Sequence, residues 1–353
     1  MLGEIIMQTL KKILKCAGIV MGTFVLLVLI FHLIPRRPTM EANPFIVGRG
    51  NRPMVAAHAG GNLEFPGNTL EAMFNSYHVD PNVMFELDVN MTRDGVIILS
   101  HCRTLDRRSN VTGYIHDWYF ADLVEQEVSF GYFHPIGSNG TRPLEMDLIP
   151  YTNYAGVSVT PLDVVYPLGV SPRHDYKFLV TTLEEAIRTF PNNLMTVEVK
   201  QSGDIGLQSV DAIIELMERL DAAYNTFARI GLASFHTSNF ERFVELRETT
   251  HPQLMFSPSG SGLRPVYIAH WVGLDFIYNP QFTLAQIPTR EGSLPLDTRH
   301  FIRALHRHNI AVQYWTINDE ETMRHLISQG ADAIVTGRPT LLKEILDEIF
   351  EQY

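Results

Sequence analysis

The chain has 353 residues, of which 45% are hydrophobic and 19% charged. This is the composition of a folded protein and excludes an intrinsically disordered one. The formal net charge is −11, although residues 1–40 carry five basic side chains and only one acidic one, so the rest of the chain is strongly acidic. An acidic body argues against nucleic acid as the main partner. Of the two cysteines, Cys16 and Cys102, only Cys102 belongs to that body, so no disulfide can form within it.

The first predicted element is an uncharged apolar run from Cys16 to Ile34, with three lysines before it and two arginines after it. Such a run is long enough to cross a bilayer. A cleaved signal peptide is the alternative, but the run is longer than a usual signal-peptide core and no small-x-small cleavage site follows. We therefore predict a membrane-spanning helix at about 16–34 within an N-terminal segment, residues 1–40. The three lysines before the span favour a single-pass membrane protein with an extracytoplasmic body.

From Met54 onward, short apolar runs alternate with helical patterns, which is typical of parallel βαβ units. The expected strands are 54–60, 83–90, 194–200, 229–235, 253–259, 275–280, 311–317 and 331–337. Residues 95–101 are expected to pair with the second strand as a hairpin, with Asp94 and Gly95 in the turn. Helices are expected at 69–78, 181–190, 205–220, 238–248, 297–308, 319–329 and 339–351, with Thr182 and Asn318 as start signals for two of them. Eight strands with intervening helices predict one (β/α)₈ barrel, an α/β fold, over residues 41–353.

Residues 128–178 do not fit this alternation, because they are rich in Gly, Pro, Tyr and Asn and lack sustained periodicity. So long a segment without regular elements is unusual inside a compact domain. It follows the second strand and its hairpin, at the same end of the barrel as the polar residues described next. We expect a cap-like insertion that shapes a substrate pocket; the alternative is a disordered or purely structural excursion.

Four residues within a short stretch, His58, Glu86, Asp88 and His101, indicate acid/base and metal chemistry. Glu86 and Asp88 alternate in FELDV and therefore lie on one face of a strand. Neighbouring carboxylates repel each other, and a divalent cation held by oxygen ligands relieves that repulsion. The two histidines end the apolar runs MVAAH and GVIILSH, where loops can build a site. Each residue alone could be an ordinary polar group at a strand end, but the four together favour a functional site.

Active sites of such barrels lie at the carboxyl ends of the strands, and three later residues meet that condition. Glu198 and Lys200 share one face at the end of TVEVK. Glu198 completes a three-carboxylate cage suited to Ca²⁺ or Mg²⁺, and Lys200 is suited to hold a phosphate oxygen. Trp315 ends a later strand and offers an apolar wall, although a tryptophan at this place is more often part of a core.

The chain from about Met54 to the C-terminus resembles the glycerophosphodiester phosphodiesterase family. That family has a (β/α)₈ fold and the ordered motifs HRG, PENT, E-x-D, T-x-DG, HD and LDR-T, then E-x-K and a late WTVN…G-x-DGI-TDRP. This chain reads HAGG (58–61), PGNTLEAM (66–73), ELD (86–88), TRDG (92–95), HC (101–102), LDRRSNVTG (105–113), EVK (198–200) and WTIN…GADAIVTGRP (315–339). The resemblance covers roughly the whole body and keeps the order and spacing of the motifs.

The resemblance implies that His58 and His101 are an acid/base pair and that Glu86, Asp88 and Glu198 bind a divalent metal, Ca²⁺ or Mg²⁺. Lys200 and Trp315 would then line the substrate side. The implied reaction is hydrolysis of a glycerophosphodiester or a lysophospholipid to glycerol phosphate and an alcohol, with the membrane reached through the N-terminal helix. Two alternatives stay open: a phospholipase-like reaction that forms a cyclic phosphate, and a catalytically weak, membrane-tethered binding protein.

The chain also departs from the family pattern. Ala59 replaces the arginine of HRG, which removes a bidentate phosphate donor. Gly67 replaces the glutamate of PENT, Cys102 the aspartate of HD, and Gly337 the aspartate of TDRP. None of these changes removes a proposed metal ligand or either histidine, so activity is expected, with a different headgroup preference or rate.

Overall fold

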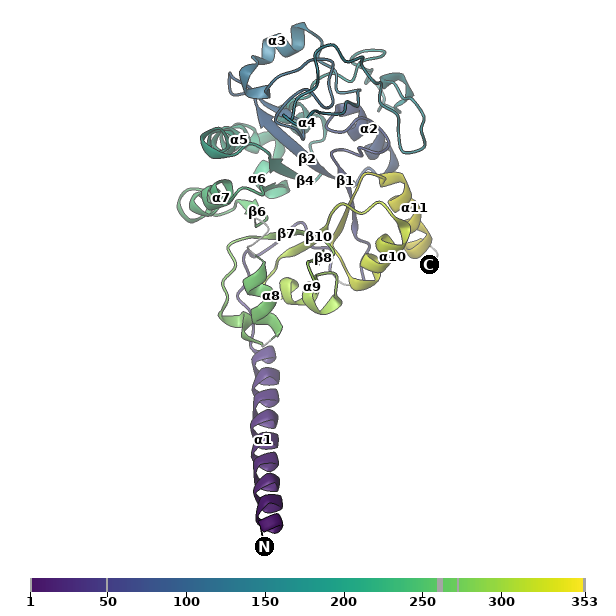
Figure 1. Ribbon diagram of the computed structural model, residues 1–353. Helices are drawn as coiled ribbons and strands as arrows, with labels where there is room; N and C mark the ends of the chain where they lie inside the picture. Colours follow the sequence, from purple (N-terminus) through teal and green to yellow (C-terminus); the bar gives the residue numbers. More distant parts are fainter. Residues whose placement is uncertain (1, 49, 259–262, 272, 352–353) are drawn as a thin grey trace.

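The computed structural model shows a long N-terminal helix that projects from an α/β body (Figure 1). It describes residues 2–48, 50–258, 263–271 and 273–351. Two predictions extend beyond the described residues. These are the last residue of the strand expected at 253–259 and the last two residues of the barrel expected over 41–353.

Eight parallel strands form the centre of the body, in the order β6-β5-β4-β2-β1-β11-β10-β7. They are β1 Met54–His58, β2 Met84–Met91, β4 Met195–Val199, β5 Ile230–Ala233, β6 Met255–Phe256, β7 Leu284–Ile287, β10 Ala311–Tyr314 and β11 Ala333–Thr336. The two outer strands approach each other, because the Thr283 amide donates to the Phe256 carbonyl at 3.0 Å. The sheet is therefore a nearly closed barrel, as the strand and helix alternation predicted.

Three shorter strands lie beside the barrel. β3 (Ile97–Leu99) pairs antiparallel with β2, and Gly95 in the connecting turn has φ of 83°, a conformation that glycine adopts without strain. The expected hairpin is thus confirmed. β8 (Arg290–Glu291) and β9 (Leu294–Pro295) form a separate small hairpin after β7.

The helices follow the strands at nearly the expected places. They are α2 Leu70–Val79, α4 Leu183–Thr189, α5 Gly203–Tyr224, α7 Thr237–Thr249, α9 Arg299–His306, α10 Glu320–Gln329 and α11 Pro339–Phe350. Thr182 caps α4 through a capping box with Glu185, as expected. The cap expected at Asn318 was wrong: Asp319 caps α10, while Asn318 accepts a hydrogen bond from the Gly337 amide.

Six short helices complete the described chain. They are α3 Phe120–Glu125, α6 Thr226–Arg229, α8 Arg264–Trp271, η1 Ile115–Asp117, η2 Pro161–Asp163 and η3 Leu274–Ile277. η3 occupies the place of the strand expected at 275–280, so that expectation was wrong. The apolar residues there do not enter the barrel: Asp275 is buried against Arg36, and Ile277 is exposed. The strand begins instead at Leu284, and Leu284, Ala285 and Ile287 are all buried.

Two apolar layers surround the strands. Outward-facing residues such as Leu87 and Val89 pack against the helices in the larger cluster. Inside the barrel, a smaller cluster contains Met84 and Leu284 together with Phe45, which comes from the segment before β1 and is fully buried. Burying a side chain of this size contributes about 1.5–3 kcal/mol. Met84 shares its face of β2 with Glu86 and Asp88, so apolar residues fill one end of the barrel and carboxylates the other.

The N-terminal helix α1 (Leu2–Leu33) starts well before the predicted span of about 16–34. Its stretch Ile6–Leu33 is long and apolar enough to cross a membrane, and most of its side chains are exposed. α1 meets the body beside η3 and α8 (Figure 1). Just beyond it, the guanidinium of Arg36 forms a buried ion pair with Asp275, with Nε 2.8 Å from Oδ2. The residues that follow the helix are thus packed into the body.

The insertion at 128–178 adds no strand to the barrel and lies at the end of the body remote from α1 (Figure 1). Its Tyr151 hydroxyl donates to the Asn62 carbonyl at 3.0 Å, and its Arg173 forms an ion pair with Glu71 of α2 at 3.3 Å. The insertion is therefore fastened to the β1–α2 connection and to α2.

Candidate active site

His58 is the last residue of β1 and lies in register with Glu86 of β2. Its Nε2 is 3.8 Å from Glu86 Oε2, and its Nδ1 is buried without a hydrogen-bond partner among the described residues. A tight turn follows the histidine. Gly61 in this turn has φ of 111°, and a Cβ there would lie 2.6 Å from Ser76 Oγ, so the turn requires glycine. β1 and its turn thus hold the imidazole at the carboxyl end of the barrel.

Three carboxylates meet beside His58. Glu86 and Asp88 lie on the inner face of β2, and Asp88 is in register with Glu198 of β4. One oxygen from each lies within 4.8 Å of the others. Asn68 supports this arrangement: its amide donates to Asp88 Oδ2 at 3.0 Å and its carbonyl oxygen accepts from the Asp88 backbone at 3.1 Å. Parallel pairing of β2 with β4 therefore brings together carboxylates that are about a hundred residues apart in the sequence.

The Lys200 ammonium lies between two of these carboxylates, 2.9 Å from Asp88 Oδ1 and 2.8 Å from Glu198 Oε1. Burial, followed by the nearby charges of Asp88 and Glu198, raises the pKa of Glu86 well above its usual value. Burial likewise raises the pKa of Glu198. Burial opposes ionisation of Asp88 too, but Lys200 and the two histidines outweigh it and lower the pKa of that carboxyl. The group therefore has more negative charge than a single ammonium offsets.

Glu86, Asp88 and Glu198 are suited to bind a hard divalent cation. Such ions take oxygen ligands, and three convergent carboxylates provide them. The raised pKa of Glu86 is a second indication, because a carboxyl that resists ionisation among like charges is stabilised as an anion by a nearby cation. The structure thus contains a candidate acidic metal-binding group, and its donor set does not distinguish Ca²⁺ from Mg²⁺.

His101 follows the β3 hairpin and is solvent-exposed. Desolvation by its surroundings lowers its pKa; Lys200 and His58 act in the same direction, and Asp88 opposes them. A neutral imidazole at neutral pH can accept a proton. The Cys102 sulfur lies 3.9 Å from His101 Nδ1, at the position of the family's aspartate.

A cavity of about 530 Å³ brings all the predicted site residues except Asp88 to one surface. Its polar part consists of His58, Glu86, His101, Glu198 and Lys200, and its apolar part includes Phe235, Leu263, Ile287, Leu296 and Trp315. The Trp315 ring meets Phe235 edge to face, with centroids 5.5 Å apart. The cavity can therefore receive a molecule with one charged end and one apolar end.

A second hollow of about 230 Å³ lies on the other side of the histidines. Asp88 reaches it, together with Arg107 and Arg108 from the loop after His101 and Phe130 and Tyr151 from the insertion. Sequence reasoning gave no role to Asn68 or to the two arginines. The signals were present, because PGNT and LDRRSN were recognised as motifs, but only the fold shows which of their side chains reach the site.

Comparison with known proteins identifies the chain. Residues 58–341 match the model of the glycerophosphoryl diester phosphodiesterase family. The chain belongs to this family. Its members are phosphoric diester hydrolases, and so is this protein.

Individual relatives support the same family. Lysophospholipase D GDPD3 of Homo sapiens is 22% identical over 93% of this chain and 94% of its own length. A glycerophosphodiester phosphodiesterase of Bacillus altitudinis is 21% identical over 84% and 98%. Among solved structures, a phosphodiesterase of Oleispira antarctica in complex with the product sn-glycerol-3-phosphate has a TM-score of 0.55 at 19% identity and covers 84% of this chain and 97% of its own. The glycerophosphodiester phosphodiesterase of Agrobacterium tumefaciens has a TM-score of 0.55 at 16% identity, with coverages of 82% and 99%. These structural likenesses confirm the barrel.

Two of the departures from the glycerophosphodiester phosphodiesterase pattern, Gly67 and Gly337, lie against one side chain, Asn62. A Cβ at Gly67 would lie 2.7 Å from Asn62 Cβ and 3.1 Å from Ala59 Cβ. A Cβ at Gly337 would lie 2.5 Å from Asn62 Oδ1. The space that the family's acidic side chains would need at these two positions is therefore taken up by Asn62.

Proposed function

We propose that the protein is a membrane-anchored, metal-dependent enzyme that hydrolyses a glycerophosphodiester to glycerol phosphate and an alcohol, or a lysophospholipid to an acylglycerol phosphate and an alcohol. The observation that supports this most is that His58, His101, Glu86 and Glu198 line one cavity together with apolar side chains, with Asp88 beside the two glutamates.

In the proposed reaction, the two imidazoles carry the protons. His101, whose pKa is lowered, accepts a proton from the attacking water as the new oxygen–phosphorus bond forms. His58, which lies beside Glu86, protonates the alcohol oxygen as its bond to phosphorus breaks. A cation held by Glu86, Asp88 and Glu198 would supply Lewis-acid stabilisation of the negative charge on the phosphoryl group. Lys200 donates to a phosphate oxygen, and Trp315 lines the path of the remaining substrate.

The substrate class follows from the cavity and the anchor. A lysophospholipid has a charged phosphodiester next to a long apolar chain, and the cavity has both charged and apolar walls. The relatives named lysophospholipase D GDPD3 in human and mouse support this choice. Helix α1 would hold the body beside the bilayer that contains such lipids, on its extracytoplasmic side, and the insertion at 128–178 would serve as a cap over the second hollow.

The test is an assay of the full-length protein in lipid nanodiscs. Glycerophosphocholine, glycerophosphoethanolamine, glycerophosphoinositol and lysophospholipids are offered with Ca²⁺, with Mg²⁺ or with chelator. We expect metal-dependent release of the alcohol together with glycerol phosphate, or with an acylglycerol phosphate from a lysophospholipid, for at least one substrate. This activity should be lost in His58→Ala and in His101→Ala and retained in the control His78→Ala, which alters an exposed histidine of α2. Activity in chelator, or in His101→Ala, would contradict the mechanism. If a cyclic phosphate accumulates as the final product, the reaction is not hydrolysis. It is then transfer of the phosphoryl group to the substrate's own hydroxyl.

A further inference from the structure

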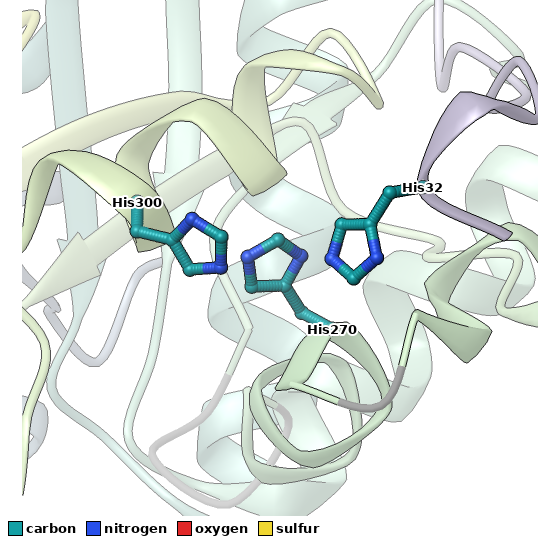
Figure 2. A group of neighbouring side chains, drawn as sticks. All are labelled: His32, His270 and His300. Carbon is teal, nitrogen blue, oxygen red and sulfur yellow. The ribbon is translucent and has the colours of Figure 1, made fainter. Parts of the chain in front are cut away.

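Three histidines from distant parts of the chain meet where helix α1 joins the body. His32 lies in the last turn of α1, His270 in the last turn of α8, and His300 in the first turn of α9. Figure 2 shows the His270 ring between the other two. One ring nitrogen of each histidine lies within 4.8 Å of those of the other two. Three segments are therefore joined at one point by groups that can all bind a metal.

His270 is the buried histidine of the three, and within the part of the chain that the structure describes its ring nitrogens lack the hydrogen bonds that buried polar groups normally make. His270 is only 2% exposed, yet neither of its ring nitrogens has a hydrogen-bond partner among the described residues. Leaving a buried polar group unpaired costs about 1–3 kcal/mol. Its Nδ1 faces Asp275 Oδ2 at 3.6 Å, which leaves Nε2 for a ligand.

The other two histidines can offer a lone pair as well. His32 Nδ1 lies 2.8 Å from the Val28 carbonyl, so it carries the hydrogen and Nε2 is left as the acceptor. A backbone carbonyl on one imidazole nitrogen is a common way of orienting the other toward a metal. His300 is exposed, and one of its ring nitrogens lies within 4.8 Å of a ring nitrogen of each of the other two histidines.

Packing of the rings against one another does not account for the group. The His270 and His300 centroids lie 4.2 Å apart, and those of His32 and His270 lie 5.6 Å apart. Such contacts bury the rings but give the His270 nitrogens no partner.

We propose that His32, His270 and His300 form a binding site for a transition-metal dication, Zn²⁺ in particular, which ties the membrane helix to the catalytic body. Imidazole nitrogens suit zinc, whereas Ca²⁺ and Mg²⁺ require oxygen ligands, so this site differs in chemistry from the carboxylate group in the barrel. Zinc–nitrogen bonds of about 2.0–2.1 Å in a tetrahedron place the nitrogens about 3.4 Å apart. The three nitrogens lie within 4.8 Å of one another, so the side chains would rotate to close the remaining separation on binding, and water would supply the fourth ligand.

Asp275 completes the site from behind. It is fully buried, faces His270 Nδ1 and forms the ion pair with Arg36, which follows α1. A carboxylate behind a histidine ligand holds the ring in place and strengthens its bond to the metal. The metal site and the Arg36–Asp275 pair therefore support the same junction from two sides.

The test uses the untagged full-length protein in detergent, stripped with chelator and then titrated with Zn²⁺ and, separately, with Co²⁺. We expect bound zinc by elemental analysis, a tetrahedral Co²⁺ absorption spectrum, and a zinc-dependent rise of the melting temperature. In His300→Ala, zinc affinity falls by about 100-fold or more, since even groups behind the ligands are worth about 10- to 100-fold. His300 is exposed, so this variant is expected to fold, and its melting temperature without metal provides the check.

Two further variants make the result specific. His78→Ala removes an exposed histidine of α2 and is expected to leave the zinc affinity and the cobalt spectrum unchanged. Glu198→Gln weakens the carboxylate group and is also expected to leave the cobalt spectrum unchanged. The proposal is overturned if His300→Ala binds zinc as the wild type does, or if all bound metal is lost in Glu198→Gln.

Discussion

The ammonium of Lys200 lies between two carboxylates, 2.9 Å from Asp88 Oδ1 and 2.8 Å from Glu198 Oε1. In the protein without metal, it offsets part of the repulsion among Glu86, Asp88 and Glu198. We expect Lys200→Met to lower kcat/KM by about 10- to 100-fold, because a charged hydrogen bond to the substrate phosphate contributes about 1.5–3 kcal/mol. The measurement is steady-state kinetics of the full-length protein with saturating metal.

Lys200→Met is also expected to change how much added metal raises the melting temperature. Without the ammonium, the carboxylates repel one another more strongly, so added Ca²⁺ or Mg²⁺ raises the melting temperature of Lys200→Met more than that of the wild type. Lys343→Met, which removes an ion pair within α11, is the matched control. An equal metal-induced shift in the wild type and Lys200→Met would show that Lys200 does not balance this charge.

Cys102 occupies the place of an aspartate beside His101. We expect Cys102→Asp to raise the pKa of His101, because a carboxylate next to an imidazole favours its charged form. His101 acts as a base only when neutral. The acidic limb of the plot of kcat/KM against pH therefore moves to higher pH, by about one unit. The pH–rate profile measures this, with Cys102→Ser as the uncharged control. A limb that stays in place in Cys102→Asp would argue against His101 as the base.

Arg36 and Asp275 form an ion pair in which neither side chain is exposed. We expect Arg36→Met to lower the free energy of unfolding by about 3–5 kcal/mol, since it leaves a buried carboxylate without its partner. Arg37→Met, at the exposed neighbouring position, is expected to change little. Chemical denaturation in detergent compares the two variants, and equal stabilities would contradict the importance of the junction.

Glu184 joins α4 to α5 by accepting hydrogen bonds from Arg219 and Arg188. Its hydrogen bond with Arg219 is the main cause that lowers the pKa of Glu184 to about 2. A lowered carboxyl pKa stabilises the folded state above the unfolded pKa of about 4.5, and this contribution is lost as pH falls toward 2. We expect Glu184→Gln to cost about 0.5–1 kcal/mol at pH 7, because the pair is partly exposed.

The pH dependence distinguishes this ion pair from a general effect of the substitution. Urea unfolding at pH 7, 5 and 4 should show the difference between Glu184→Gln and the wild type shrinking toward acid pH. Glu125→Gln, at an exposed position of α3, serves as the control and should follow the wild type throughout. A difference that does not change with pH would show that charge is not its origin.

Much of the barrel was predictable because its signals are local. Alternation along FELDV placed Glu86 and Asp88 on one face, and the apolar runs before His58 and His101 indicated strand ends. The wrong strand prediction at 275–280 also came from a local signal. An apolar run there looked like a strand, but Asp275 pairs with Arg36, which is 239 residues away, and no local pattern carries that information.

The sequence by itself determined the repeating units, the ends at which reactive side chains stand, and the apolar N-terminal run, because periodicity and residue type depend on neighbours in the chain. Tertiary structure alone decided which side chains meet. Pairing of β2 with β4 places Glu198 beside Asp88, and packing of α8 and α9 against the end of α1 gathers His32, His270 and His300. Contacts between such distant segments arise when the barrel closes and its helices bury their apolar faces, and no single segment specifies them.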